Sequence, residues 1–165
     1  MEYVEVESDL NLNLSRLLAL ISASAVGTKA ELLLTLDRLV IYDFLARNPI
    51  LLLKILRQME KKYKIEAREY EAGSLSSKYY NKSDIYNFEA VRNLVQMLFA
   101  KKLIVVNRLS QDQFTIFATD EGNTFCQGLQ ADYYQRFSEL GSALKSLNSS
   151  STSQLRTQIN LLVNV

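Results

Sequence analysis

Apolar side chains recur at helical spacing in the first third of the chain. Between residues 12 and 26 they fall at intervals of three and four positions: Leu14, Leu17, Leu18, Ile21 and Ala25. This period predicts a helix with one apolar face, and Gly27 occupies the position of a C-terminal cap. Thr28 and Glu31 form the pattern of a capping box, which predicts a second helix that ends before Asn48. Pro49 suits the first position of a helix, so we expect a third helix capped by Asn48.

The second half of the chain combines a helix pattern with a hairpin pattern. Apolar side chains mark one face of a helix at residues 88–98, and branched apolar residues follow at 103–106. A polar turn at 110–113 and a second apolar run at 114–117 complete an antiparallel hairpin. Thr119 is placed to cap a further helix. The succession of helix, hairpin and helix within residues 84–130 predicts a winged helix-turn-helix.

The remaining regions differ in composition. Residues 61–83 mix basic and acidic side chains with Gly-Ser and Ser-Ser pairs, which is typical of a solvated connection. Residues 131–147 predict an amphipathic docking or dimer helix, and residues 148–165 predict a flexible linker with an apolar tail. The expected fold is one domain, residues 1–165, mainly α with a small β-hairpin wing. Residues 10–60 form its helical N-terminal part.

The composition narrows the chemistry. The 165 residues include 19 basic and 18 acidic side chains, one cysteine and no histidine. The chain therefore lacks the usual general base and the commonest metal ligand, and one cysteine cannot form an internal disulfide or a cysteine zinc site. It also contains none of the glycine-rich motifs that hold phosphates. We expect a protein that is not an enzyme and that holds no cofactor or metal.

The sequence carries no membrane signal either. Its first residues are acidic, unlike the basic start of a signal peptide, and no apolar run approaches the roughly 18 residues of a membrane span. A net charge of +1 gives no general attraction to nucleic acid or to a membrane surface. The expected location is the cytoplasm, and any contact with DNA has to come from a local patch.

The clearest such patch is the polar side of the predicted helix before the wing. Arg92, Asn93 and Gln96 have the chemistry that reads base edges in a DNA-binding winged helix. Lys78 and Lys82, with Tyr79 and Tyr80, form a small basic-aromatic cluster that is a more credible contact patch than the one at residues 61–70. Further basic side chains that would extend a DNA contact are Lys101, Lys102 and Arg108. Because each phosphate contact needs its own donor and this surface offers few, we favour the alternative, a solvated face on a structural or protein-binding winged helix.

A second basic cluster lies in the charged connection. It consists of Lys61, Lys62, Lys64 and Arg68, interleaved with Tyr63 and Tyr70. Cations meet phosphates and aromatic rings stack on bases, so this composition fits a nucleic-acid strand. Four nearby acids offset most of the charge: Glu60, Glu66, Glu69 and Glu71. A solvated, charged connection is therefore the favoured interpretation.

Two sets of residues are candidates for a partner interface. In the second helix, Arg38 with Tyr42 and Asp43 with Arg47 are spaced four residues apart, which suits either surface ion pairs or a partner interface. In the predicted C-terminal helix, the apolar stripe contains Tyr133, Phe137, Leu140 and Leu144. A chain with several long apolar stripes and no catalytic chemistry is expected to bury some of them against a partner.

The layout as a whole resembles a known family. The stretch Arg38-x-x-x-Tyr42-Asp43-Phe44-Leu45 precedes the winged-helix run at 94–104, then Phe114-Thr115 and Thr119-x-x-Gly122-x-x-Phe125, then the helix from Tyr133. In this order the chain resembles, over about residues 10–147, the middle component of ABC-three-component systems. That group includes the small subunit of Lamassu-type bacterial defence systems.

The resemblance implies a non-catalytic accessory subunit that bridges an SMC-like ABC ATPase and an effector, often a nuclease. Such complexes act against phage or plasmid DNA, and the resemblance implies that DNA is met mainly through the complex. The competing interpretation from the residues is a winged-helix transcription regulator that dimerises through residues 132–147 and reads an operator with Arg92. The first interpretation predicts one copy in a larger assembly, and the second predicts a homodimer.

Overall fold

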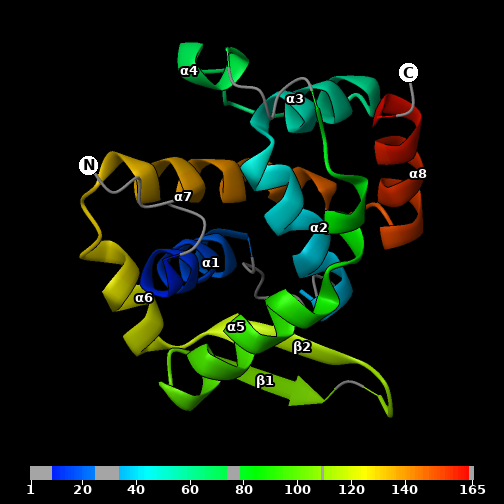
Figure 1. Cartoon of the computed structure of the whole chain (residues 1–165). Helices are drawn as coiled ribbons and strands as arrows, with labels where there is room; N and C mark the ends of the chain where they lie inside the picture. The colour runs from blue at the N-terminus through cyan, green and yellow to red at the C-terminus, as the bar shows by residue number, and fades with distance from the viewer. Residues whose placement is uncertain (1–8, 25–33, 74–78, 109, 164–165) are drawn as a thin grey trace.

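The computed structural model describes residues 9–24, 34–73, 79–108 and 110–163, and they fold mainly as helices with one small hairpin (Figure 1). The first half contains α1 (Leu10–Ser24), α2 (Leu36–Arg47), α3 (Pro49–Gln58), α4 (Glu69–Ala72) and the 3₁₀ helix η3 (Lys82–Tyr86). The second half contains α5 (Phe88–Ala100), β1 (Ile104–Arg108), β2 (Phe114–Ala118), α6 (Asp120–Gln127), α7 (Asp132–Leu144), the 3₁₀ helix η4 (Lys145–Leu147) and α8 (Thr152–Val163). The prediction of a mainly helical fold with a β-hairpin is confirmed.

Helix α1 lies in the centre of the fold. It packs against α7 over most of its length and also contacts α2, α5, α6 and β2. Leucines occupy more than one face of this helix, and Leu17, Leu18 and Leu20 are all fully buried. The uninterrupted apolar run at residues 17–21 covers every side of this part of the helix, which suits a buried position. The other helices are therefore arranged around α1 rather than in a flat layer.

The hairpin carries a short third extended segment. β1 and β2 pair antiparallel from Ile104 opposite Ala118 to Arg108 opposite Phe114. Thr35 forms an isolated bridge with Thr115, and the Ile116 amide donates to the carbonyl of Leu34 at 2.9 Å. The order is then helix α1, extended segment, helices α2 and α5, and two strands. This is the element order of a winged helix.

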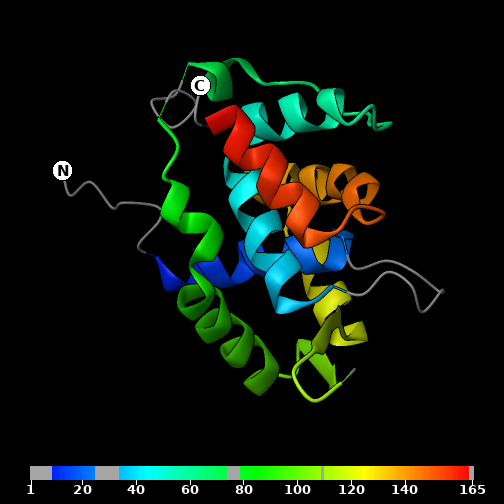
Figure 2. The same ribbon diagram turned by 90° about the vertical axis from the view of Figure 1, so that its right-hand side faces the viewer.

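This element order changes the boundaries that the sequence predicts for the winged helix. The winged helix was predicted within residues 84–130, but α1, α2 and the segment at Leu34 belong to it because they pack on α5 and β2. Residues 49–87, with α3, α4 and η3, form an insertion between α2 and α5. In Figures 1 and 2 the insertion reaches the end of the molecule opposite the hairpin. The helical part and the winged part are thus interlaced rather than consecutive.

Two expectations about helix ends are corrected. The second helix starts at Leu36, because Leu34 and Thr35 are extended and the Thr35 side chain accepts from the amide of Arg38. Gly27, Thr28 and Glu31 lie outside the described residues. Asn48 does precede α3, but its side-chain amide donates to the carbonyl of Phe44 at 2.8 Å instead of capping α3.

The flexible linker and apolar tail expected at 148–165 are also wrong, because this region contains helix α8. Ser151 and Gln154 form its start, where the Gln154 amide donates to the Ser151 hydroxyl and the Ser151 amide donates to the Gln154 side chain. Leu155 and Ile159 are spaced four residues apart and are fully buried. α8 contacts α2 and α3 (Figure 2). The serines thus belong to a capping box, and the apolar residues belong to the core.

Two glycines of the α6 region provide a test of the packing between α6 and the start of the hairpin. A Cβ added at Gly122 would lie 2.1 Å from the carbonyl oxygen of Leu103, whereas one at Gly128 would lie no closer than 3.4 Å to any neighbour. We expect Gly122→Ala to lower the free energy of unfolding by about 1–3 kcal/mol. Gly128→Ala should change it by no more than about 0.5 kcal/mol. Urea denaturation measures both, and equal stabilities would contradict the close approach.

Candidate functional site

The first predicted interface pair, Arg38 and Tyr42, holds the chain's own turn between η4 and α8. The Arg38 guanidinium donates to the carbonyl oxygens of Leu147 at 3.1 Å and Ser150 at 2.6 Å. The Tyr42 hydroxyl donates to the side chain of Asn148 at 2.5 Å. Burial raises the pKa of Tyr42 to about 12, although the Arg38 charge and hydrogen bond act in the opposite direction. These two side chains therefore serve the fold, since Tyr42 is fully buried.

The second pair, Asp43 and Arg47, is part of a network that joins three elements. Asp43 is only 3% exposed, and its carboxylate lies 3.3 Å from Nε of Arg16 on α1 and 3.2 Å from Nε of Arg47. Arg47 also reaches Asp84 of η3 at 3.7 Å. A buried carboxylate is tolerated only when it is paired, so this network ties α1, α2 and η3 together. Neither a surface ion pair nor a partner interface describes it.

The C-terminal stripe is also internal. Phe137, Leu140 and Leu144 are 7%, 1% and 0% exposed, and α7 packs along α1. The prediction of a docking face at these three residues is wrong because their side chains fill the core. Tyr133 is 36% exposed and stacks edge-on against the ring of Phe137 at 5.0 Å. A charge placed at Phe137 or Leu144 would test folding rather than docking.

The structure does bring the predicted DNA-contact residues of α5 together. Arg92, Asn93 and Gln96 are exposed on one side of the helix, and Lys101 and Lys102 are exposed just after its end. Arg108 is exposed in β1 and donates to the backbone carbonyls of the adjacent hairpin turn. Lys78 lies outside the described residues, and of Lys82 only the backbone, in η3, is described. These side chains are therefore available on the surface of the protein.

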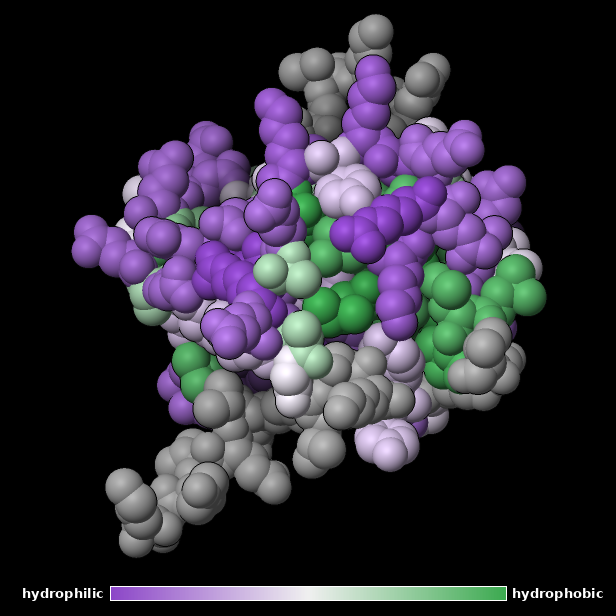
Figure 3. Space-filling model, turned by 90° about the horizontal axis from the view of Figure 1, so that it is seen from above, coloured by the Kyte–Doolittle hydropathy of each residue, from purple (hydrophilic) through white to green (hydrophobic). Residues whose placement is uncertain are grey.

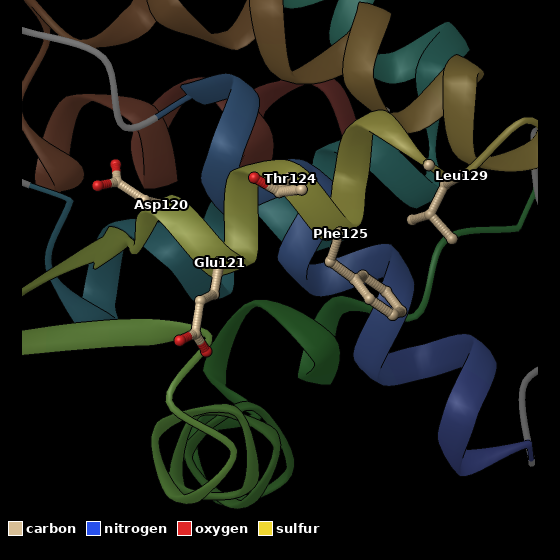
Figure 4. A pocket seen from close by; sticks show the side chains of 6 residues that line it. Asp120, Glu121, Thr124, Phe125 and Leu129 are labelled. Carbon is tan, nitrogen blue, oxygen red and sulfur yellow. The ribbon is translucent and has the colours of Figure 1, made fainter.

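Apolar and acidic side chains share this end of the molecule. Phe99 and Met97 of α5 are 55% and 39% exposed. Next to the end of α5, Thr119 donates to the carbonyl of Lys102 at 2.9 Å, which places the acidic start of α6 beside the two lysines. An open groove along α6 is lined by Asp120, Glu121, Thr124, Phe125, Gly128 and Leu129 (Figure 4). The end of α5 is thus neither purely basic nor purely polar.

One buried ion pair could not be read from the sequence. The guanidinium of Arg136 on α7 donates to both carboxylate oxygens of Glu71 on α4, each at 2.7 Å, and also to the carbonyl of Glu66 at 2.8 Å. Burial by itself lowers the pKa of Arg136, but the hydrogen bonds with Glu71 and Glu139 reverse this effect and raise it. The partners lie far apart in the sequence, so no local spacing could have revealed them.

The described residues show no arrangement of reactive groups typical of an active site. Within them, no group of three or more His, Cys, Asp or Glu side chains is placed to hold a metal. Burial raises the pKa of the Cys126 thiol, although a hydrogen bond with Ser22 partly offsets this. Such a thiol is a poor nucleophile. No helix in the described part of the chain is long and apolar enough to cross a membrane.

The fold and these surfaces describe a helical protein with a winged-helix core, an insertion and several exposed faces. Residues 24–157 match the family model of ABC-three component (ABC-3C) system Middle Component 4. Because the match spans most of the chain, the chain belongs to this family. No curated protein and no solved structure matches it. Family membership makes the chain an accessory component that associates with other members of an ABC-three-component system.

The pKa of Tyr42 generates a pH prediction. Below pH 10 the tyrosine is protonated in both states, and between about 10 and 12 only the unfolded chain releases the proton, because the folded pKa is raised. The wild type should therefore lose up to about 2.7 kcal/mol more stability than Tyr42→Phe as the pH rises through this window.

Urea unfolding at pH values of about 9 and 11.5 measures this difference. Tyr79→Phe is the matched control, because Tyr79 is 78% exposed and should leave the wild-type pH dependence intact. The same pH dependence in Tyr42→Phe and in the wild type would contradict the assignment.

Proposed function

We propose that the chain is a non-catalytic, cytoplasmic subunit that bridges an SMC-like ABC ATPase and an effector nuclease in a bacterial defence complex of the Lamassu type. The complex would act against phage or plasmid DNA. The observation that carries this proposal is the family match over residues 24–157.

The placement of exposed surfaces supports bridging. A bridging subunit needs two faces that do not compete for the same partner. α5, with exposed Phe99, and the α6 groove, with exposed Phe125, lie at the end of the molecule that carries the hairpin (Figure 1). The insertion with α3 and α4 lies at the other end. Exposed aromatic side chains are common anchors in protein interfaces, which favours the first end for a protein partner.

Bridging predicts that the chain is needed to hold the other two components together. With an affinity tag on the ATPase, the effector should be recovered from cells that contain all three components and lost from cells without this chain. Mass spectrometry identifies the recovered proteins. The matched control restores the chain as Gly128→Ala, which should return recovery to the wild-type level. Recovery of the effector in the absence of the chain would contradict bridging.

A transcription regulator remains the second candidate, because Arg92, Asn93 and Gln96 are exposed together on the helix that precedes the hairpin. Native mass spectrometry separates the two functions. The accessory subunit should be found in an assembly with an ABC ATPase, and a regulator should be found as a homodimer that shifts a palindromic DNA site. Loss of that shift in Arg92→Ala would favour the regulator and contradict our proposal.

A further inference from the structure

The fold separates charges that alternate in the sequence. Of the acids in residues 60–71, Glu71 is buried and hydrogen-bonded to Arg136. The one arginine of that stretch, Arg68, is paired with acids of α7 instead, at 2.7 Å from Asp132 and 3.4 Å from Glu139. The ion pairs formed by residues 60–71 therefore lie at the α4 end of the insertion. The lysines of the same stretch are left at its other end.

Those lysines join basic side chains from two other elements. We define the basic face as Lys54, Arg57, Lys61, Lys62, Lys64 and Lys145. Residues 61–68 return beside α3, where Arg57 donates to the Tyr63 hydroxyl at 3.0 Å. The same segment is attached to the turn after α7, because Ser146 donates to the carbonyl of Lys62 and Lys61 donates to Ser149, both at 2.8 Å.

The local backbone turns the lysines outward. Residues 61–68 have no regular secondary structure. Tyr63 and Ile65 are half-buried against the core, whereas Lys62 and Lys64, which alternate with them, are exposed. Alternation of this kind places the two lysines on the same side of the segment. Figure 3 looks down on this end of the molecule and shows hydrophilic side chains over much of it.

Among the described residues, no lysine of the basic face forms an ion pair. Every ion pair among the described residues is made by an arginine: Arg16, Arg47, Arg68, Arg136 and Arg156. The acids that stay exposed in the same stretch of chain are Glu60, Glu66 and Glu69, and Glu69 lies at the α4 end. Six basic side chains on the face against three exposed acids in this stretch leave an excess of positive charge on a chain whose overall net charge is only +1.

We propose that the basic face binds the phosphate backbone of duplex DNA without reading its sequence. Lysine and serine side chains are typical phosphate contacts, and the exposed Ser149 lies beside Lys61. The site differs from the expected recognition helix, because α3 and α5 lie at opposite ends of the molecule (Figures 1 and 2). The proposal does not rest on bridging, since the isolated chain can be tested.

Duplex DNA fits this face better than an acidic protein does. Protein interfaces are centred on buried aromatic and apolar anchors and are depleted in lysine. On the basic face the apolar Tyr63 and Ile65 are half-buried against the core, and five of the six basic side chains are lysines. DNA also fits here better than at α5, where Phe99 is exposed and the acidic start of α6 adjoins Lys102.

The test compares two double variants that remove the same charge at opposite ends of the full-length chain. Lys62→Gln with Lys64→Gln removes two cations from the basic face, and Lys101→Gln with Lys102→Gln removes two from the end of α5. All four side chains are exposed, so thermal unfolding should not change. The probe is a fluorescent DNA duplex of about 20 base pairs, and anisotropy gives Kd at salt concentrations between about 50 and 200 mM.

We expect the Lys62/Lys64 variant to bind about tenfold more weakly at low salt, with a salt slope shallower by about 2, while the Lys101/Lys102 variant keeps the wild-type values. No binding of the wild type at about 50 mM salt would overturn the proposal. It would equally be overturned if the two variants lost the same affinity. A polyglutamate peptide that binds in a Lys62-dependent and Lys64-dependent way and is not displaced by the duplex would assign the face to an acidic protein instead.

Discussion

The buried ion pair between Glu71 and Arg136 is the contact on which the insertion at residues 49–87 depends. Both side chains are nearly inaccessible to water, and a charge in such a place is tolerated only with a close partner. The pair attaches α4 to α7, and the hydrogen bond from Arg136 to the carbonyl of Glu66 fixes the preceding backbone. Removing one partner of a buried pair typically costs about 3–5 kcal/mol. The path of residues 61–68 beside α3, and with it the basic face, follows from this attachment.

Features with a local physical cause could be predicted from the sequence. The apolar period of α5, the branched residues of β1 and the Thr119 cap of α6 each act within a few residues, and each element is present. Features with distant partners could not be predicted. Asp43 was assigned to a helix surface because its near neighbour Arg47 is visible in the sequence, whereas Arg16, on another helix, is not. The same limit explains the error at α7, whose apolar stripe is covered by α1 rather than by a partner.

The α8 error has a different origin. The composition of residues 148–153 is typical of a linker, but Ser151 and Gln154 satisfy each other's backbone amides and Leu155 begins an apolar stripe. A capping box followed by that spacing was a local signal that could have been recognised. For the candidate surfaces, the sequence identified the exposed residues of α5. It could not identify the basic face, because that face combines the lysines of residues 61–64 with Lys54, Arg57 and Lys145 from other elements, and only the fold brings these elements together.

The central claim is that folding brings basic side chains from α3, residues 61–64 and η4 together as a cationic face at the end opposite the winged-helix hairpin. Chemical-shift mapping of the ¹⁵N-labelled chain during titration with duplex DNA tests it most directly, since each backbone amide reports on its own surroundings. The account predicts the largest salt-sensitive shifts at Arg57, Lys62, Lys64, Lys145 and Ser149. Shifts centred on Arg92 and Gln96 of α5, with the basic face unchanged, would contradict it.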